Sequence, residues 1–168
     1  TGLTGLKSLN ISGCTALTVE NITGLDTCTE LTELNVSGCT NIGELNLNSN
    51  AKLETVNLSN CSALKSFVID DAAKTYALKN INLTGCTALE TLIINNALSL
   101  SSIDLADSAA IKEISLGGCQ NVSGVLNLSN KSALTTLELS AAGFTSLNVT
   151  GCAALTEINA LACSGPTT

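Results

Sequence analysis

Apolar residues recur along the chain in a short unit of the form Leu-x-x-Leu-x-Leu-x-x-Cys, in which Asn can replace the final Cys. One copy occupies residues 31–39, the next 42–50 and a third 53–61. The alternation Leu-x-Leu within each unit is typical of a short strand that turns two apolar side chains to one face. The polar residues that follow, ending in Cys or Asn, predict a turn.

The unit returns about every eleven residues from one end of the chain to the other. The first inward strand residue of each block falls at positions 9, about 23, 34, 45, 56, 67, 81, 92, 103, 114, 126, 137, 147 and 158. The step widens to fourteen before 23 and before 81, and it is twelve before 126 and ten before 147. A nearly fixed period of this kind is the sequence signature of a repeat architecture.

A single block has an apolar face and nothing to cover it, so the blocks must stack to bury their faces in one continuous core. Two blocks make one turn of about 22 residues. The fourteen blocks therefore predict a mostly β solenoid of about seven turns, roughly 34 Å long at ~4.8 Å per strand. We expect little helix, because no segment carries a sustained 3.6-residue period.

The repeat resembles the leucine-rich repeats, whose signature is Leu-x-x-Leu-x-Leu-x-x-Asn-x-Leu, over blocks from Leu6 to Cys163. Residues 22–38 are similar to a repeat of the bacterial internalins, and the Ser-Gly-Cys turns are similar to the bacterial subclass in which Cys replaces the turn Asn. The resemblance implies a right-handed leucine-rich-repeat solenoid over 1–163, with 164–168 as a linker or tail. It also implies a bacterial protein, secreted or attached to the cell surface, that serves in adhesion or in interaction with host molecules.

Charge and composition narrow the classes of partner. The net charge is −7, from seven basic and fourteen acidic residues, and the basic residues form no cluster. We therefore expect no nucleic acid and no anionic membrane surface as partner. No apolar run approaches the ~20 residues of a membrane span, so we expect no membrane insertion within this segment. No signal peptide is visible and the chain opens at Thr1, which is typical of a mature or trimmed piece.

Eight Cys stand in the turn position of their blocks, at 14, 28, 39, 61, 86, 119, 152 and 163. Cys39, Cys61 and Cys86 lie one turn apart with parallel side chains, whereas a disulfide needs two Cβ atoms directed at each other at ~3.8 Å. The spacing favours a column of free thiols that act as small buried hydrophobes with a weak donor. Disulfides remain an alternative because the number is even. Zinc is disfavoured, since the chain has no Cys-x-x-Cys and no His.

No catalytic constellation is visible, so we interpret the chain as not an enzyme and expect no cofactor. Without His, acid–base chemistry would fall on Asp, Glu, Lys, Cys or Tyr, and a Cys without a His partner is a weak nucleophile. The adjacent pair Asp70-Asp71 could hold calcium but is more typical of a solvated strand end. The Asn-x-Ser/Thr triplets follow from the repeat itself, which places Asn in the strand and Ser or Thr two residues later.

One outward face is predicted to be polar and nearly uncharged. The middle outward residue of its successive blocks is Asn10, Asn35, Asn57, Asn82, Asp104, Asn127 and Asn148. Amides stacked from coil to coil could stabilise the sheet. They could also form a hydrogen-bonding strip for a glycan or polymer, or order water as ice-binding solenoids do, although the face has no aromatic platform and no regular Thr array.

The second outward face has an apolar centre, where Val68 and Ile93 occupy positions that other blocks fill with polar residues. The widened step nearby places an insertion over residues 70–77, and insertions in repeat proteins often map to the binding face. Tyr76, the only Tyr, lies in this insertion and could supply a ring and a hydroxyl. We predict a partner site at Val68, Ile93 and Tyr76, flanked by Asp70 and Asn95. A harmless excursion of the loop is the alternative.

Two functions of different classes remain. The first is a non-catalytic cell-surface or secreted module that mediates protein or glycan binding and adhesion. The second is a structural spacer domain of a larger surface protein.

Overall fold

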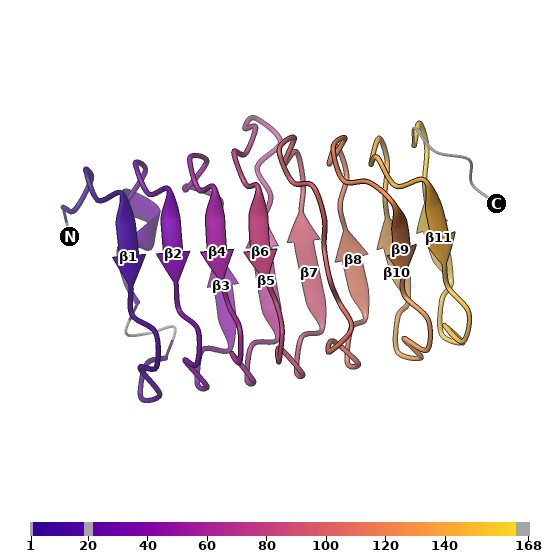
Figure 1. Cartoon of the computed structure of the whole chain (residues 1–168), viewed down its shortest axis with the longest axis horizontal. Coiled ribbons are helices and arrows are strands. Elements are labelled where there is room, and N and C mark those ends of the chain that lie inside the picture. The colour runs from indigo at the N-terminus through magenta and orange to yellow at the C-terminus, as the bar shows by residue number, and fades with distance from the viewer. Residues whose placement is uncertain (1, 19–21, 164–168) are drawn as a thin grey trace.

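The protein is a β-solenoid, as the repeat predicts. The computed structural model describes residues 2–18 and 22–163. It is mostly β and 2% helical, with parallel strands stacked in about 7 turns of roughly 22 residues. The strands lie side by side along the long axis, with β1 near one end of the solenoid and β11 near the other (Figure 1). The linker or tail predicted for 164–168 lies outside the described residues.

Twelve strands are present in the described residues. They are β1 (Ser8–Asn10), β2 (Glu33–Asn35), β3 (Glu44–Asn46), β4 (Thr55–Asn57), β5 (Ser66–Ile69), β6 (Asn80–Asn82), β7 (Thr91–Ile94), β8 (Glu113–Ser115), β9 (Val125–Asn127), β10 (Thr136–Glu138), β11 (Ser146–Asn148) and β12 (Glu157–Asn159). One short 3₁₀ helix, η2 (Leu25–Thr27), precedes β2.

The strands form two opposite faces of the solenoid. The first face holds the sheet β1-β2-β4-β6 and, further along, the pair β9-β11; the second face holds the six-stranded sheet β3-β5-β7-β8-β10-β12. In Figure 1, β1, β2, β4 and β6 point one way and β7 and β8 point the other, because each coil runs up one face and down the other. All pairings are parallel and one-to-one, as in Leu34↔Val56↔Ile81.

The core lies between the two faces and is built almost entirely from aliphatic side chains. In β2 the outward Glu33 is exposed while Leu34 is 1% exposed, and Val36 just after the strand is fully buried. The same alternation repeats in the other interior coils. Most predicted inward positions, Phe67 and Phe144 included, are buried, so the period-2 pattern assigns the inner side of most strands correctly. Leu9, Ile81, Ile103 and Leu147 are half-buried, and Thr23 and Ile158 are exposed.

A left-handed residue turns the chain after most strands, which explains why Gly or Asn precedes the turn Cys. Gly85 has φ 76° and Asn60, one coil earlier, has φ 61°. A Cβ added at Gly85 would lie 2.6 Å from Oδ1 of Asn60, so the stacked turns also require a small residue there. Gly and Asn are the residues that adopt this conformation at least cost.

Two of the fourteen predicted strands are missing from the described residues. At the block near 23, residues 22–24 form no strand, and Gly24 with φ 92° leads into η2 instead. At the block at 103, residues 101–105 form no strand, which separates β6 from β9 on the first face. The carboxylate of Asp107 accepts the Gly85 N–H at 2.8 Å, whereas the equivalent Gly38 N–H donates to a backbone carbonyl of the next coil. The Asp107 side chain thus takes the place of the backbone carbonyl that accepts this hydrogen bond in a regular coil.

Replacing Leu83 by Ala should lower the free energy of unfolding by about 2–5 kcal/mol, because it opens a cavity where two coils pack. Leu83 is 3% exposed, while its neighbour Asn82 is exposed and its amide oxygen accepts only the Thr84 N–H at 3.0 Å. Asn82→Ala should therefore cost only about 1 kcal/mol, the net value of one hydrogen bond. Urea unfolding of both variants measures the difference. Equal losses of stability in the two variants would contradict the assignment of Leu83 to the core and Asn82 to the surface.

Candidate functional site

Val68 and Ile93 lie together on the second face, as predicted. Val68 is in β5 and Ile93 is in β7, and the two residues are direct partners in the parallel pairing of these strands. Both side chains are half-buried. The same positions in the neighbouring strands hold Asn46 and Ser115. The two aliphatic side chains therefore form one small apolar strip in the centre of a polar sheet, which we call the Val68–Ile93 strip.

Asp70 and Asn95 border this strip and bind each other. The Asn95 amide nitrogen donates to Oδ1 of Asp70 at 3.2 Å. The Asn95 amide oxygen accepts from the Ser115 hydroxyl at 2.8 Å and from the Gly117 N–H at 2.9 Å. Asn95 therefore forms hydrogen bonds to the coil before it and to the coil after it, and its amide oxygen already accepts two hydrogen bonds. Asp70 is exposed and keeps acceptor capacity for a partner.

Tyr76 does not present its ring on the surface, and this part of the prediction is wrong. The residue is 2% exposed. Its hydroxyl donates to the Asn48 carbonyl at 3.1 Å and its N–H donates to the Asn96 carbonyl at 3.0 Å. The insertion carries exposed Ala72 where other blocks place a buried turn residue, so the Tyr76 ring fills the vacant core position. Burial raises the pKa of Tyr76, and the charges of Asp71 and Asp70 raise it further.

The Asn residues of the first face serve mainly to end their own strands. The amide or carboxylate oxygen of each accepts the backbone N–H two residues later, at 2.9–3.1 Å, for Asn10, Asn35, Asn57, Asn82, Asp104, Asn127 and Asn148. Within the described residues, one hydrogen bond joins two of these side chains in successive coils: the Asn148 amide nitrogen donates to the Asn127 amide oxygen at 3.1 Å. A continuous ladder of stacked amides is therefore absent there. Near the N-terminal end, β1, β2 and β4 line a shallow groove of about 270 Å³ on this face.

The turn cysteines form two columns of hydrogen bonds between coils, one after the first-face strands and one after the second-face strands, and the prediction of free thiols is confirmed. Six of them donate S–H to a carbonyl of the preceding coil at 2.9–3.2 Å: Cys39, Cys61, Cys86, Cys119, Cys152 and Cys163. Each acceptor carbonyl lies at the start of the turn below, as Val36 does for Cys61. Cys14 departs from the prediction, because it begins the stack and is exposed.

Asn and Lys side chains also donate from the same turn position. Asn50 donates its amide to the Leu25 and Cys28 carbonyls at 2.8 and 2.9 Å. Lys131 is buried, and its ammonium donates to the Leu105 and Ala106 carbonyls at 2.6 and 3.0 Å. Burial lowers the pKa of Lys131, while the charges of Asp104 and Asp107 act in the opposite direction. Sequence reasoning overlooked this lysine, although its place in the repeat marks it as a turn residue.

Ion pairs between successive coils were also overlooked. Lys52 pairs with Glu30 at 2.6 Å, Lys79 with Glu54 at 2.8 Å and Lys112 with Glu90 at 2.6 Å. The partners are 22 or 25 residues apart, one coil length, and that spacing was the signal available in the sequence. Exposed pairs of this kind contribute little to stability, so they do not make a site.

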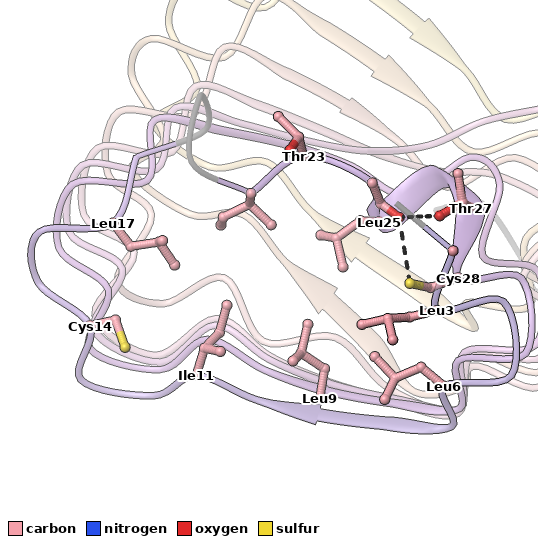
Figure 2. Close-up of a pocket in the computed structure, with 13 residues that line it drawn as sticks. Leu3, Leu6, Leu9, Ile11, Cys14, Leu17, Thr23, Leu25, Thr27 and Cys28 are labelled. Atoms are coloured by element: carbon pink, nitrogen blue, oxygen red, sulfur yellow. Dashed lines mark hydrogen bonds between the residues drawn. The ribbon is translucent and has the colours of Figure 1, made fainter.

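The N-terminal end of the solenoid holds an open apolar cavity of about 250 Å³. Figure 2 shows the side chains of Leu6, Leu9, Ile11, Leu17 and Leu25 directed into it from both faces of the first coil. These are core positions that no preceding coil covers. The sequence pattern identified them as inward but could not show that they are open to solvent.

Within residues 2–18 and 22–163, no group of three or more His, Cys, Asp or Glu side chains could hold a metal ion. The same residues contain no helix long and apolar enough to cross a membrane. The fold thus defines the chain as a β-solenoid. Comparison with protein families, with curated proteins and with solved structures gives no match for it.

Thiol labelling should separate the exposed cysteine from the column. In dilute native protein, Cys14 should react at once and the half-buried Cys152 and Cys163 slowly, while the five buried thiols should stay unlabelled. Denaturation without reductant should then release eight reactive sulfurs, the full count of the chain. Mass spectrometry of labelled peptides assigns each site, and disulfide-linked peptides in the oxidant-free sample would contradict the column.

Stability should fall in alkaline solution. Burial raises the pKa of Cys61 and Cys119 to about 11 and that of Cys86 to about 12, from 9.0. A raised folded-state pKa means that the stability contribution is complete below pH 9 and is lost as the pH rises through 11–12, because the unfolded chain releases these protons first. Each thiol should cost about 1 kcal/mol at pH 10. Burial lowers the pKa of Lys131 below its unfolded value of 10.5. This residue alone would therefore make the protein more stable as the pH rises towards 10.5, which opposes the loss from the thiols.

Urea unfolding at pH 8 and pH 10 measures this loss. Cys86→Ser is the matched control, because its hydroxyl can donate to the Leu58 carbonyl as the thiol does but does not titrate in this range. The variant should lose less stability than the parent between the two pH values. The same loss in both proteins would show that Cys86 does not contribute.

Proposed function

We propose that this solenoid is a non-catalytic binding module of a secreted or cell-surface protein of bacterial type, and that it contacts a protein partner through the second face. The observation that carries the proposal is the Val68–Ile93 strip in the six-stranded sheet. The leucine-rich-repeat and internalin-like character, and with it the bacterial surface location, rests on the sequence motifs and is part of this proposal.

The strip supports protein binding because affinity concentrates in a few apolar side chains that a partner can desolvate. Parallel strands on both sides fix the two backbones, so little conformational entropy is lost when the face is covered. Asp70 and the Asp70–Asn95 hydrogen bond supply a polar border. Two half-buried aliphatic residues are a small contact, which fits a weak or transient partner better than an obligate one.

The chemistry of the described residues supports a non-catalytic role. The thiols are the main nucleophiles, and most are buried and donate to backbone carbonyls rather than facing a base. Burial raises the pKa of Cys61, Cys86 and Cys119, which makes these thiols weaker nucleophiles near neutral pH. The buried lysine likewise donates to two carbonyls. A nucleophile needs an adjacent base and access to substrate.

A glycan is the alternative ligand, and the first-face groove favours it. The groove is lined by short polar side chains, including Ser8, Asn35, Thr55 and Asn57. The amide nitrogens of these Asn residues remain able to donate, because only their oxygens are used by the turns. The residues that line the groove include no aromatic side chain for a sugar ring to stack on. We therefore favour a protein partner over a glycan.

A spacer role is the other alternative. It is favoured by the regular stack of parallel strands, which builds an elongated domain. A spacer needs no partner on either face. A chain that acts only as a spacer should therefore show no binding at the Val68–Ile93 strip.

The double substitution Val68→Asn and Ile93→Asn should leave the fold intact and weaken partner binding at least tenfold, since Asn occupies the equivalent position in β3. Binding would be measured by screening the chain against immobilised host proteins and glycans and titrating the hits. Val125→Asn is the matched control, because Val125 is an exposed aliphatic residue on the first face, 62% exposed. Unchanged affinity in the double variant would show that the partner does not bind through the Val68–Ile93 strip. Glycan hits that are lost on Asn57→Ala would favour the groove.

A further inference from the structure

Among the described residues, the outward positions of the second face carry acidic side chains and no basic ones. These positions are the first residue of each strand in the six-stranded sheet and the residues two and four places later. The acidic residues there are Glu44, Asp70, Glu113, Glu138 and Glu157. The corresponding positions of the first face hold Glu33 and Asp104, so the second face is the more negative of the two.

Two of these carboxylates lie on the β3–β5 side of the Val68–Ile93 strip. Asp70 follows Val68 by two residues in the same coil, a rise of about 7 Å along an extended chain. Glu44 begins the neighbouring strand β3, two residues before Asn46, the register partner of Val68. The apolar strip thus has one carboxylate beyond the end of its own strand and another near the start of the strand beside it.

Two more carboxylates lie on the β8–β10 side of the strip. Ser115 in β8 is the register partner of both Ile93 and Glu138, so two strand spacings put these residues about 10 Å apart. Between them, β8 offers small outward residues: Ser115 is only 8% exposed, and Gly117 has no side chain. Glu113 begins the same strand. A basic side chain that crosses β8 from an apolar contact at Ile93 would therefore reach a carboxylate.

These four carboxylates are free to bind a cation from a partner. The carboxylates that pair with lysine in the described residues are others, namely Glu30, Glu54, Asp71 and Glu90. Asp70 uses one oxygen for the Asn95 amide, and Glu138 uses Oε1 for the Ser140 N–H at 2.6 Å. An ionised carboxylate accepts more bonds than this, so each keeps acceptor capacity.

The lysines nearest to the strip do not cancel its negative border. Lys74 is held 2.9 Å from Asp71. Lys112 is held 2.6 Å from Glu90, and its hydrogen bond and charge, with a smaller contribution from the charge of Lys65, lower the pKa of Glu90. Two lysines and one glutamate leave a single positive charge at this rim, against the four negative charges around the strip.

We propose that the partner of the second face is a basic protein segment. One aliphatic or aromatic side chain of the segment covers the Val68–Ile93 strip, and Lys or Arg side chains on either side bind the carboxylates of Asp70, Glu113 and Glu138. The proposal rests on the proposed function, because it uses the same strip as the contact. Arg suits this surface well, since its stem packs on aliphatic groups while its guanidinium binds a carboxylate.

The charge pattern favours such a segment over other ligands. Nucleic acids and anionic lipids carry the same sign as this face and are repelled by it. A metal ion does not fit, because the four carboxylates belong to separate coils and no group of three or more in the described residues could hold one. Complementary charges around an apolar centre speed association and select the partner.

A random peptide library displayed on phage is the probe that tests this proposal. Selection on the folded chain should enrich peptides that combine an apolar residue with at least two Lys or Arg. The affinity of a synthesised enriched peptide should fall about tenfold in the triple variant Asp70→Asn, Glu113→Gln and Glu138→Gln, because each exposed ion pair contributes about twofold. The new amide oxygens can still accept from Asn95 and Ser140, so the fold is kept.

The matched control is Glu54→Gln with Asp104→Asn, which removes two carboxylates from first-face coils and should change the affinity by less than twofold. Salt gives a second readout. Raising the ionic strength from about 0.1 M to about 1 M shortens the Debye length from ~10 Å to ~3 Å. Binding to the unmodified chain should weaken about tenfold, and binding to the triple variant should hardly change. Far-UV circular dichroism and thermal unfolding confirm that all variants fold.

Enriched peptides without basic residues, or equal affinity of the triple variant and the unmodified chain, overturn the proposal. If those peptides still lose binding on Val68→Asn with Ile93→Asn, the strip binds a partner of different chemistry and the proposed function stands. If no peptide is enriched, or if neither set of substitutions changes the affinity, both the basic partner and the strip are rejected. Loss of binding in the triple variant alone would reject the strip as the apolar contact, and with it this proposal.

Discussion

The hydrogen bonds between one coil and the next are the constraint on which the rest of this structure depends. A three-residue strand cannot be stable alone, and a single coil has an apolar inner side that it cannot cover. Stacking in one-to-one register satisfies the backbone of both coils and closes the core at the same step. Many turn residues add a further bond between coils, because their side chains donate to a carbonyl of the preceding coil, as Cys61 does to Val36. Register therefore controls burial, turn geometry and the position of every outward side chain.

The same constraint explains where the structure departs from regularity. The turn position accepts several residue types: Cys, Asn50 and a buried Lys131 donate from it to carbonyls of the preceding coil, whereas Ala97 and Ala142 fill it with small buried side chains. Where Ala72 fills it, the chain lengthens and Tyr76 enters the core from the insertion. Where the carboxylate of Asp107 takes the Gly85 N–H, the first-face ladder is interrupted. Each local replacement keeps the core closed and changes the surface above it.

The constraint also leaves two unsatisfied places. Interior coils have neighbours on both sides, but the outer edges of β1 and β11 have none among the described residues. The outward faces, by contrast, are not needed for folding, so a residue such as Ile93 is free to be apolar or polar. The binding role that we propose for the second face thus uses positions that the stacking of the coils leaves free.

The sequence by itself determined the solenoid, the number of turns and the inner and outer side of most strands, because the eleven-residue period and the alternation within it are local properties. It favoured free thiols over disulfides, and the structure decided between them. It also placed Val68 beside Ile93, since a constant coil length aligns residues one turn apart. Only the tertiary structure decided that Tyr76 is buried, that residues 101–105 leave the sheet and that the ends are open. These outcomes depend on space left by neighbouring coils, and a repeat pattern contains no measure of that space.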